Sequence, residues 1–432
     1  MRTYKRILGA IALASLMAPL ALAQGDKPAE LKVGIVTFMS GSGGVVGGPS
    51  VDAAKLLVKQ INAAGGVDGV PLKVQYVDEE GGVSRNIANY RQLAGNVDAV
   101  IGYVSSSDCL AVAPVAEELG MLTILADCTT DSLFEGHHYK WVFRTQMPSS
   151  SNALAGALYL AKMKPDIKSV TGINQDYAFG RDEWKYFSAA VGKFLPKAKI
   201  ESPIFTKLFT NNYSSEISRL LAQNADLIYS SFWGGDNVAF VQQGSARGLF
   251  KDGHVMMSLI TQGDLEGMKA MPDGVMGGSE SSYLFHNGPF ENEKLATFVK
   301  QYHEATGQYP ISTYPYTMRR SINALVGAYK KAIAANNGKW PSKDDIVKAM
   351  EGLKVDTVLG TMTIRKDHQA SYHEIYGMTV STDKYPFKVF TNIITFPPDL
   401  ILAPEGTTDV AAWIKSLPAS TLDKVPAPVS YK

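Results

Sequence analysis

The sequence has little cysteine and no surplus of charge. It holds 2 cysteines among 432 residues, and its 42 basic residues are matched by 41 acidic ones. A near-neutral chain lacks the basic face that nucleic acid binding requires, so we expect no nucleic acid partner. Cys109 and Cys128 are too few for a cysteine-based metal site. In an oxidising compartment we favour a Cys109–Cys128 disulfide, worth about 3 kcal/mol, over two free thiols.

Enzyme signatures are missing as well. The chain has no Gly-x-Ser-x-Gly elbow and no His-Glu-x-x-His pair, and its 7 histidines are scattered. A glycine-rich segment follows the first predicted strand, yet Gly48 precedes Pro49 and Ser50 where a phosphate-binding loop needs lysine. The third glycine of a dinucleotide fingerprint is replaced by Val46. We therefore expect no catalytic residue, no cofactor and no metal.

Long apolar runs are absent beyond the N-terminus, where the pattern is that of an export signal. Arg2, Lys5 and Arg6 precede an apolar stretch over residues 7–22, and the small residues Ala21 and Ala23 mark a cleavage site. A permanent anchor is the alternative, but the stretch is shorter than the roughly 20 residues of a spanning helix. No cysteine follows the cleavage site to carry a lipid. We expect a signal peptide at 1–23 and a soluble protein of the periplasm.

From residue 31 onward, strand and helix patterns alternate, which predicts an α/β fold with parallel sheets. Two such sets, before and after residue 144, predict two lobes, and about 400 residues exceed what one core normally holds. The expected strands are 32–38, 72–77, 99–104, 122–126, 169–174, 200–205, 226–232 and 254–260, followed by antiparallel strands at 361–365, 373–380 and 387–396. Residues 274–282 are interpreted as an extended crossing and not as a core strand.

Candidate binding residues follow the predicted strands, because ligands of open parallel sheets lie beyond the carboxyl ends of the strands. The glycine-rich segment, expected to be a loop ahead of a helix that starts near Pro49, supplies Ser42 and Val46. The loops of the first lobe add Ser105, Ser106 and Ser107 and then Asp127, Cys128 and Thr129. The second lobe adds Tyr177, Phe179, Phe232 and Trp233.

Each of these groups has a structural alternative. Ser107 or Asp108 suits the N-cap of a helix, a role that is compatible with binding. Phe179 and Phe232 fit the core as well as a pocket wall, whereas Trp233 beside two glycines fits a wall or lid.

Several segments together resemble a known family: LKVGIVTFMSG, INAAGG, VIGYVSSS, NQDYAFG, DLIYSSFWGG and TMTIRKDHQ. The chain is similar to the periplasmic solute-binding proteins of ABC transporters, in the branch that binds leucine, isoleucine, valine and amides. The resemblance implies the type I fold, with two Rossmann-like lobes joined by three crossovers and a solute trapped between them. The crossovers would lie near 144–148, 277–283 and 359–363. Lobe 1 would comprise 24–146 plus 281–360, and lobe 2 would comprise 147–280 plus 361–432.

The resemblance also implies residue roles. Ser106, Ser107, Cys128 and Thr129 occupy positions that hold the carboxylate and amine of an amino acid, and Phe179 with Phe232 or Trp233 would supply the aromatic wall. The sequence departs from the family pattern at two positions that bear on the solute. Val46 stands where relatives place an aromatic residue, and the stretch that ends in Gln262 lacks the acidic residue that holds the amine of an amino acid in relatives.

The expected function is solute binding for an ABC importer by hinge closure. The solute would be an amino acid, an amide or an aromatic acid, the partner would be an inner-membrane permease, and the protein would be a monomer. Two alternatives remain open, a sensor of the same fold that signals through a receptor, and a secreted α/β enzyme.

Overall fold

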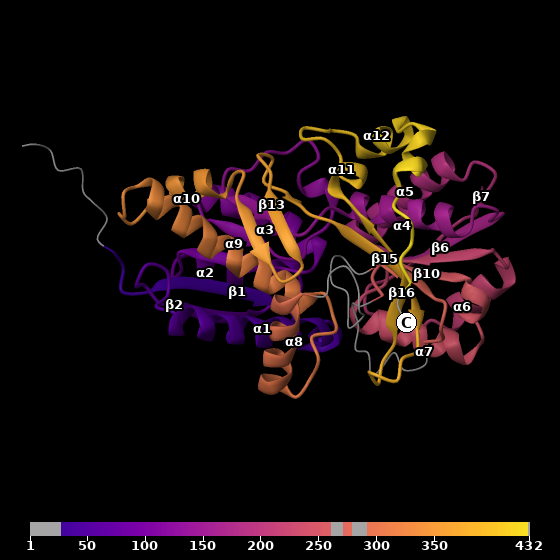
Figure 1. Cartoon of the computed structure of the whole chain (residues 1–432), viewed down its shortest axis with the longest axis horizontal. Helices are drawn as coiled ribbons and strands as arrows, with labels where there is room; N and C mark the ends of the chain where they lie inside the picture. The colour runs from indigo at the N-terminus through magenta and orange to yellow at the C-terminus, as the bar shows by residue number, and fades with distance from the viewer. Residues whose placement is uncertain (1–26, 261–270, 279–291, 431–432) are drawn as a thin grey trace, which may run out of the picture.

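Short apolar runs form parallel strands whose side chains are buried on both faces, as a sheet covered by helices requires. The computed structural model describes residues 27–260, 271–278 and 292–430, which form two α/β lobes (Figure 1). The first lobe contains a five-stranded parallel sheet in the order β2-β1-β3-β4-β5. Its strands are β1 Leu31–Thr37, β2 Leu72–Asp78, β3 Ala99–Gly102, β4 Thr123–Leu125 and β5 Val142–Arg144.

Helices from both parts of the chain cover this sheet. They are α1 Gly44–Ala63, α2 Val83–Ala94, α3 Ser106–Leu119, α8 Glu293–Thr306, α9 Tyr314–Ala335 and α10 Lys343–Met350, with 3-10 turns η1 Gly41–Gly43 and η2 Asp131–Leu133. The helix α9 packs against α1 and α10. Local signals set several ends: the side chain of Asn292 caps α8, and Ser342 forms a capping box at α10.

The second lobe holds an eight-stranded sheet that is parallel in its middle and antiparallel at one edge. Its order is β16-β15-β11-β10-β9-β6-β7, with β8 also paired to β6. The strands are β6 Ser169–Gln175, β7 Lys199–Ile200, β8 Ile204–Thr206, β9 Leu227–Ser230, β10 Val255–Met257, β11 Met276–Gly278, β15 Glu374–Val380 and β16 Val389–Phe396. The helices are α4 Ser149–Met163, α5 Ala178–Phe194, α6 Ser214–Gln223, α7 Gly234–Ala246, α11 Pro398–Ile401 and α12 Val410–Ser416, with turns η3 Lys251–Gly253 and η4 Ala419–Lys424.

A small antiparallel sheet joins the two parts of the fold. It comprises β12 Lys354–Thr357, β13 Gly360–Ile364 and β14 Ala370–Ser371, with β12 against α9. Gln369 continues the first sheet through a parallel bridge to Arg144. The predicted crossover at 359–363 is therefore wrong: these residues form the β12–β13 hairpin, and the chain crosses at 372–373, between β14 and β15.

The other two crossovers fall closer to expectation. The chain passes between the lobes at 145–148, between β5 and α4. The predicted crossing at 277–283 begins inside β11 and continues into residues that the structure does not describe. The interpretation of 274–282 as a crossing without a core strand is wrong for its first part, because Met276 and Gly277 pair with both β10 and β15.

The glycine-rich segment is mostly helical, which corrects the prediction of a loop. Residues 41–43 form a 3-10 turn and α1 begins at Gly44, so Pro49 lies inside the helix and not in its first turn. A Cβ on Gly47 would lie 1.4 Å from the carbonyl oxygen of Phe38. The glycine is needed because the helix contacts the backbone just beyond β1.

Candidate functional site

A narrow pocket lies where the strand ends of the two lobes meet. Residues from both lobes line it. The first lobe contributes the loops after β3 and β4, and the second lobe contributes those after β6, β9 and β10. The lining residues are Val104, Ser106, Asp127, Thr129, Tyr177, Phe179, Trp233 and Leu259. Apolar and aromatic side chains form most of the wall, and a few polar groups lie among them, which is the usual composition of a small-molecule site.

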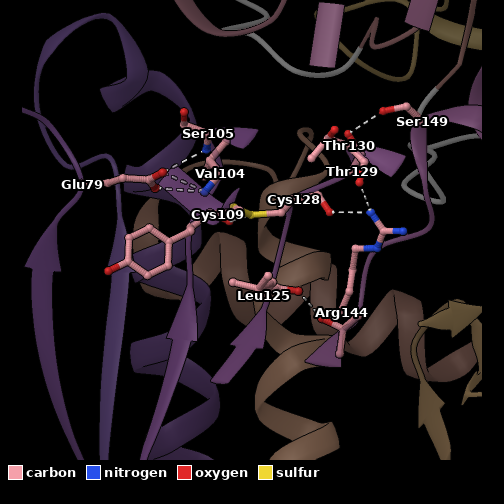
Figure 2. The surroundings of a disulfide bond; sticks show 12 residues. Glu79, Val104, Ser105, Cys109, Leu125, Cys128, Thr129, Thr130, Arg144 and Ser149 are labelled. Carbon is pink, nitrogen blue, oxygen red and sulfur yellow. Dashed lines mark hydrogen bonds between the residues drawn. A yellow bond between two sulfur atoms is a disulfide. The ribbon is translucent and has the colours of Figure 1, made fainter. Parts of the chain in front are cut away.

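Two buried charged residues hold the first-lobe wall from behind (Figure 2). The Glu79 carboxylate accepts hydrogen bonds from the backbone N–H of Val104 at 3.0 Å and of Ser105 at 2.9 Å. The Arg144 guanidinium donates to the carbonyl oxygens of Cys128 at 3.2 Å and of Thr130 at 2.7 Å. Because both loops are held by hydrogen bonds to buried side chains, the pocket wall is set before any solute binds.

A disulfide joins the two first-lobe loops. Cys109, in the first turns of α3, is bonded to Cys128 in the loop after β4, and their Cα atoms are 6.3 Å apart. Both cysteines are fully buried. The bond ties the segment that carries Ser106 to the segment that carries Asp127 and Thr129.

Asp127 is the acidic residue that lines the solute space. Its side chain is 6% exposed, and its Oδ1 atom has no hydrogen-bond partner. Burial raises the pKa of Asp127 well above its usual range, and the charge of Arg320 and a hydrogen bond from Tyr314 oppose that rise. Arg320 lies on α9 and is itself buried. An unpartnered carboxyl oxygen in a buried position is a strong acceptor for a donor group of a solute.

The second-lobe wall is aromatic and contacts the first lobe directly. Trp233 donates its indole N–H to the Tyr177 hydroxyl at 2.7 Å, so the hydroxyl proton of Tyr177 is left for another acceptor. Across the cleft, Phe38 lies 5.9 Å from Trp233 and 6.0 Å from Phe209 between ring centroids. Asn211 also donates to the Ser42 hydroxyl at 3.1 Å. The lobes are therefore in contact, and the structure is a closed form.

The structure brings together only part of the predicted residue set. Ser106, Asp127, Thr129, Tyr177, Phe179 and Trp233 line the pocket. Three others do not line it. Ser42 lies at the lobe contact and Ser107 lies on α3. Val46 is buried in α1 and packs in one cluster with the lining residues Phe179, Trp233 and Leu259. The backbone of Ser105 is bound to Glu79, and Cys128 is in the disulfide.

Two further predicted residues need separate mention. Phe232 is a core residue, packed against Tyr213 at 4.7 Å and Phe240 at 5.3 Å between ring centroids. Gln262 lies outside the described residues. Sequence reasoning missed the apolar lining residues Val104 and Leu259, because it placed them inside the predicted strands 99–104 and 254–260, whereas the observed strands end at Gly102 and Met257.

Within residues 27–260, 271–278 and 292–430 no group of three or more His, Cys, Asp or Glu side chains is arranged to hold a metal ion. Over the same residues, no helix is both long enough and apolar enough to cross a bilayer.

Two α/β lobes that close over a small pocket at their strand ends define a protein that captures a small molecule by closure. The profile of the periplasmic binding protein family matches residues 30–384, and the chain belongs to this family.

Characterised relatives agree with that membership. The chain is 26% identical to the leucine-specific-binding protein of Salmonella typhimurium, with 79% of this chain and 89% of the relative covered. It is 25% identical to the Leu/Ile/Val-binding protein of Escherichia coli, with 83% and 90% covered.

Solved structures show the same type I fold. A solute-binding protein of an ABC transporter from R. palustris, in complex with benzoate, has a TM-score of 0.73 at 19% identity, with 88% of this chain and 99% of that chain covered. A branched-chain amino acid transporter substrate-binding protein from Streptococcus pneumoniae, in complex with isoleucine, has a TM-score of 0.68 at 19% identity, with 84% and 99% covered.

Proposed function

We propose that this chain is the solute-binding component of an ABC importer, and that it delivers a small amphipathic solute to a permease of the inner membrane. It would be exported by cleavage of residues 1–23 and act as a monomer in the periplasm. The family match and the relatives support this function, since the named relatives bind amino acids and the two structural neighbours hold benzoate and isoleucine. Neither the sensor nor the secreted enzyme is favoured by any of these comparisons.

The single observation that carries the proposal is the unpartnered oxygen of Asp127 in an aromatic pocket between the lobes. We propose that the apolar body of the solute packs against Phe179, Trp233 and Leu259. Its acidic group would lie at the start of α3, near the Ser106 hydroxyl, where free backbone N–H groups favour an anion. A donor group, such as an ammonium or a hydroxyl, would meet Asp127.

Proton release on binding would distinguish an amino acid from an aromatic acid as the solute. Because burial raises the pKa of Asp127, an ammonium placed against it would make the carboxyl ionise and release a proton. The binding enthalpy of an amino acid, measured by isothermal titration in buffers of different ionisation enthalpy, would then depend on the buffer. A benzoate without a cationic group would show no such dependence.

The decisive experiment titrates the mature protein with L-leucine, L-phenylalanine, benzoate and 4-hydroxybenzoate. The Asp127→Asn variant should lose about tenfold in affinity for an amino acid, because a charge-assisted bond becomes a neutral one. Affinity for benzoate should stay within about threefold. The matched control is Asp176→Asn, which removes an exposed carboxylate paired with Arg181. If none of the four probes binds and scattering shows no closure, the proposed function is wrong.

A further inference from the structure

Another small cavity lies between α9 and the hairpin formed by β12 and β13. Tyr316, Arg319, Arg320 and Asn323 line it from α9, and residues 357–359 line it from the hairpin. It has room for a particle about the size of a water molecule. None of the described residues that line this cavity also lines the pocket between the lobes, so the two sites are separate.

Two of the lining residues carry buried donor groups without a hydrogen-bond partner. Tyr316 is 4% exposed, and its hydroxyl group is buried and unpartnered. Arg319 is partly exposed, but its Nε and Nη1 atoms are buried and have no partner either. Buried polar groups are hydrogen-bonded in the great majority of cases, so these donors call for an acceptor in the cavity.

The positive charge of Arg319 has no counter-charge in the part of the chain that the structure describes. None of the ion pairs there includes Arg319. Asp356, which precedes the hairpin turn, is exposed and paired with Lys294. Burial lowers the pKa of Arg319 to about 10, and Tyr316 opposes that fall, so the guanidinium keeps its charge at neutral pH. A charge removed from water is costly unless an opposite charge accompanies it.

Aromatic packing holds the two donor groups in place. The Arg319 guanidinium carbon lies 4.3 Å from the ring centroid of Phe298 on α8, and the Tyr316 ring lies 5.3 Å from the same ring. Stacking uses the face of the guanidinium and leaves its N–H groups, which point outward in its plane, for an acceptor. Arg320 donates to the Gln146 side chain and adds a second positive charge to the cavity. The cavity is therefore small, positive and lined by fixed donors.

We propose that this cavity is a binding site for a single halide ion such as chloride, held by the guanidinium of Arg319 and the hydroxyl group of Tyr316. A monatomic anion fits a cavity of this size, and phosphate and sulfate are too large for it. The ion neutralises Arg319 and ties α9 to the β12–β13 hairpin. It stabilises the folded protein, because the site exists only in the folded state. The site is independent of the proposed transport function, and its tests use no solute.

Bromide locates the site, since it replaces chloride and is detected by anomalous diffraction. Wild-type crystals soaked in sodium bromide should show an anomalous peak within hydrogen-bond distance of Arg319 and Tyr316. Crystals of Arg319→Met should show no peak there. The matched control is Arg219→Met, which removes an exposed arginine on α6 and should keep the peak. Absence of the peak from wild-type crystals would overturn the proposal.

Urea unfolding at constant ionic strength, with chloride replacing gluconate, measures the same site in solution. Once chloride exceeds its dissociation constant, the unfolding equilibrium constant of the wild type and of Arg219→Met should fall about tenfold for each tenfold rise in chloride. Arg319→Met should show no such dependence. Tyr316→Phe keeps the ring and removes one donor, so it should need about fivefold more chloride for the same effect.

The Tyr316→Phe variant decides the question if Arg319→Met fails to fold. A general salt effect acts on every variant alike, so equal chloride dependence in the wild type and in the folded variants at positions 316 and 319 would overturn the proposal.

Discussion

Breaking the Cys109–Cys128 bond gives the most direct measure of how the pocket frame is stabilised. The two cysteines are 19 positions apart and both are fully buried. In the chain-entropy account, a closed loop of this length stabilises the folded state by about 3 kcal/mol. With a urea dependence of about 3 kcal/mol/M, the unfolding midpoint should fall by about 1 M on reduction. The pocket should persist, because Glu79 and Arg144 hold the two loops independently of the bond.

The assay compares urea unfolding of the oxidised protein with that of protein unfolded and refolded under reducing conditions. Reduction keeps both sulfur atoms, so the difference isolates the cross-link. A variant with alanine at positions 109 and 128 should lose more than the reduced wild type, because it also leaves a cavity. The reasoning is refuted if the oxidised and reduced wild types unfold at the same urea concentration.

Two further predictions concern closure and pH. Trp233→Ala should weaken solute binding at least tenfold, because its ring contacts Phe38 of the first lobe across the closed cleft and Phe209 of its own lobe, and aromatic pairs contribute about 0.5–1.5 kcal/mol each. Small-angle scattering should show a more open protein for this variant and not for Trp413→Ala on α12. Burial raises the pKa of Asp131 to about 7, so the folded protein binds the extra proton and the free energy of unfolding should fall as pH rises from about 4 to 7, by up to roughly 4 kcal/mol. Asp131→Asn should flatten that part of the stability profile in calorimetry, and an unchanged slope would contradict the assignment.

Much of the fold follows from local patterns. Most parallel strands of both lobes are predicted by apolar runs, and the helices by periodicity and by ends such as Gly120. The three-residue strand β5, Val142–Arg144, was not predicted. The observed strand boundaries differ from the predicted ones where pairing with a segment distant in sequence determines which residues form the strand. Residues 200–205 form two short strands and not one, because β7 and β8 pair separately with β6. β11 becomes a core strand because β15, about 100 residues later, pairs with it.

In the candidate site, too, some residue positions follow from the sequence and others only from the packing. Ser106, Asp127, Thr129, Tyr177, Phe179 and Trp233 follow strands, and the edge rule for parallel sheets is enough to predict that they gather. Phe232 is one residue from Trp233, yet it points into the core. Successive residues of extended chain point to opposite sides, and only the packed sheet defines which side is the cleft.

By itself, the sequence determined the type of most elements, the division into two lobes and the loops that form a cleft, because periodicity and turn residues act over a few positions. The tertiary structure alone decided which charges are buried. Glu79, Asp108, Arg144 and Arg320 are ordinary polar residues in the sequence, and they become the frame of the pocket only when strands and helices from distant segments exclude water around them. Likewise, only the tertiary structure shows why position 47 of the glycine-rich segment is glycine: a Cβ there would collide with the backbone of Phe38.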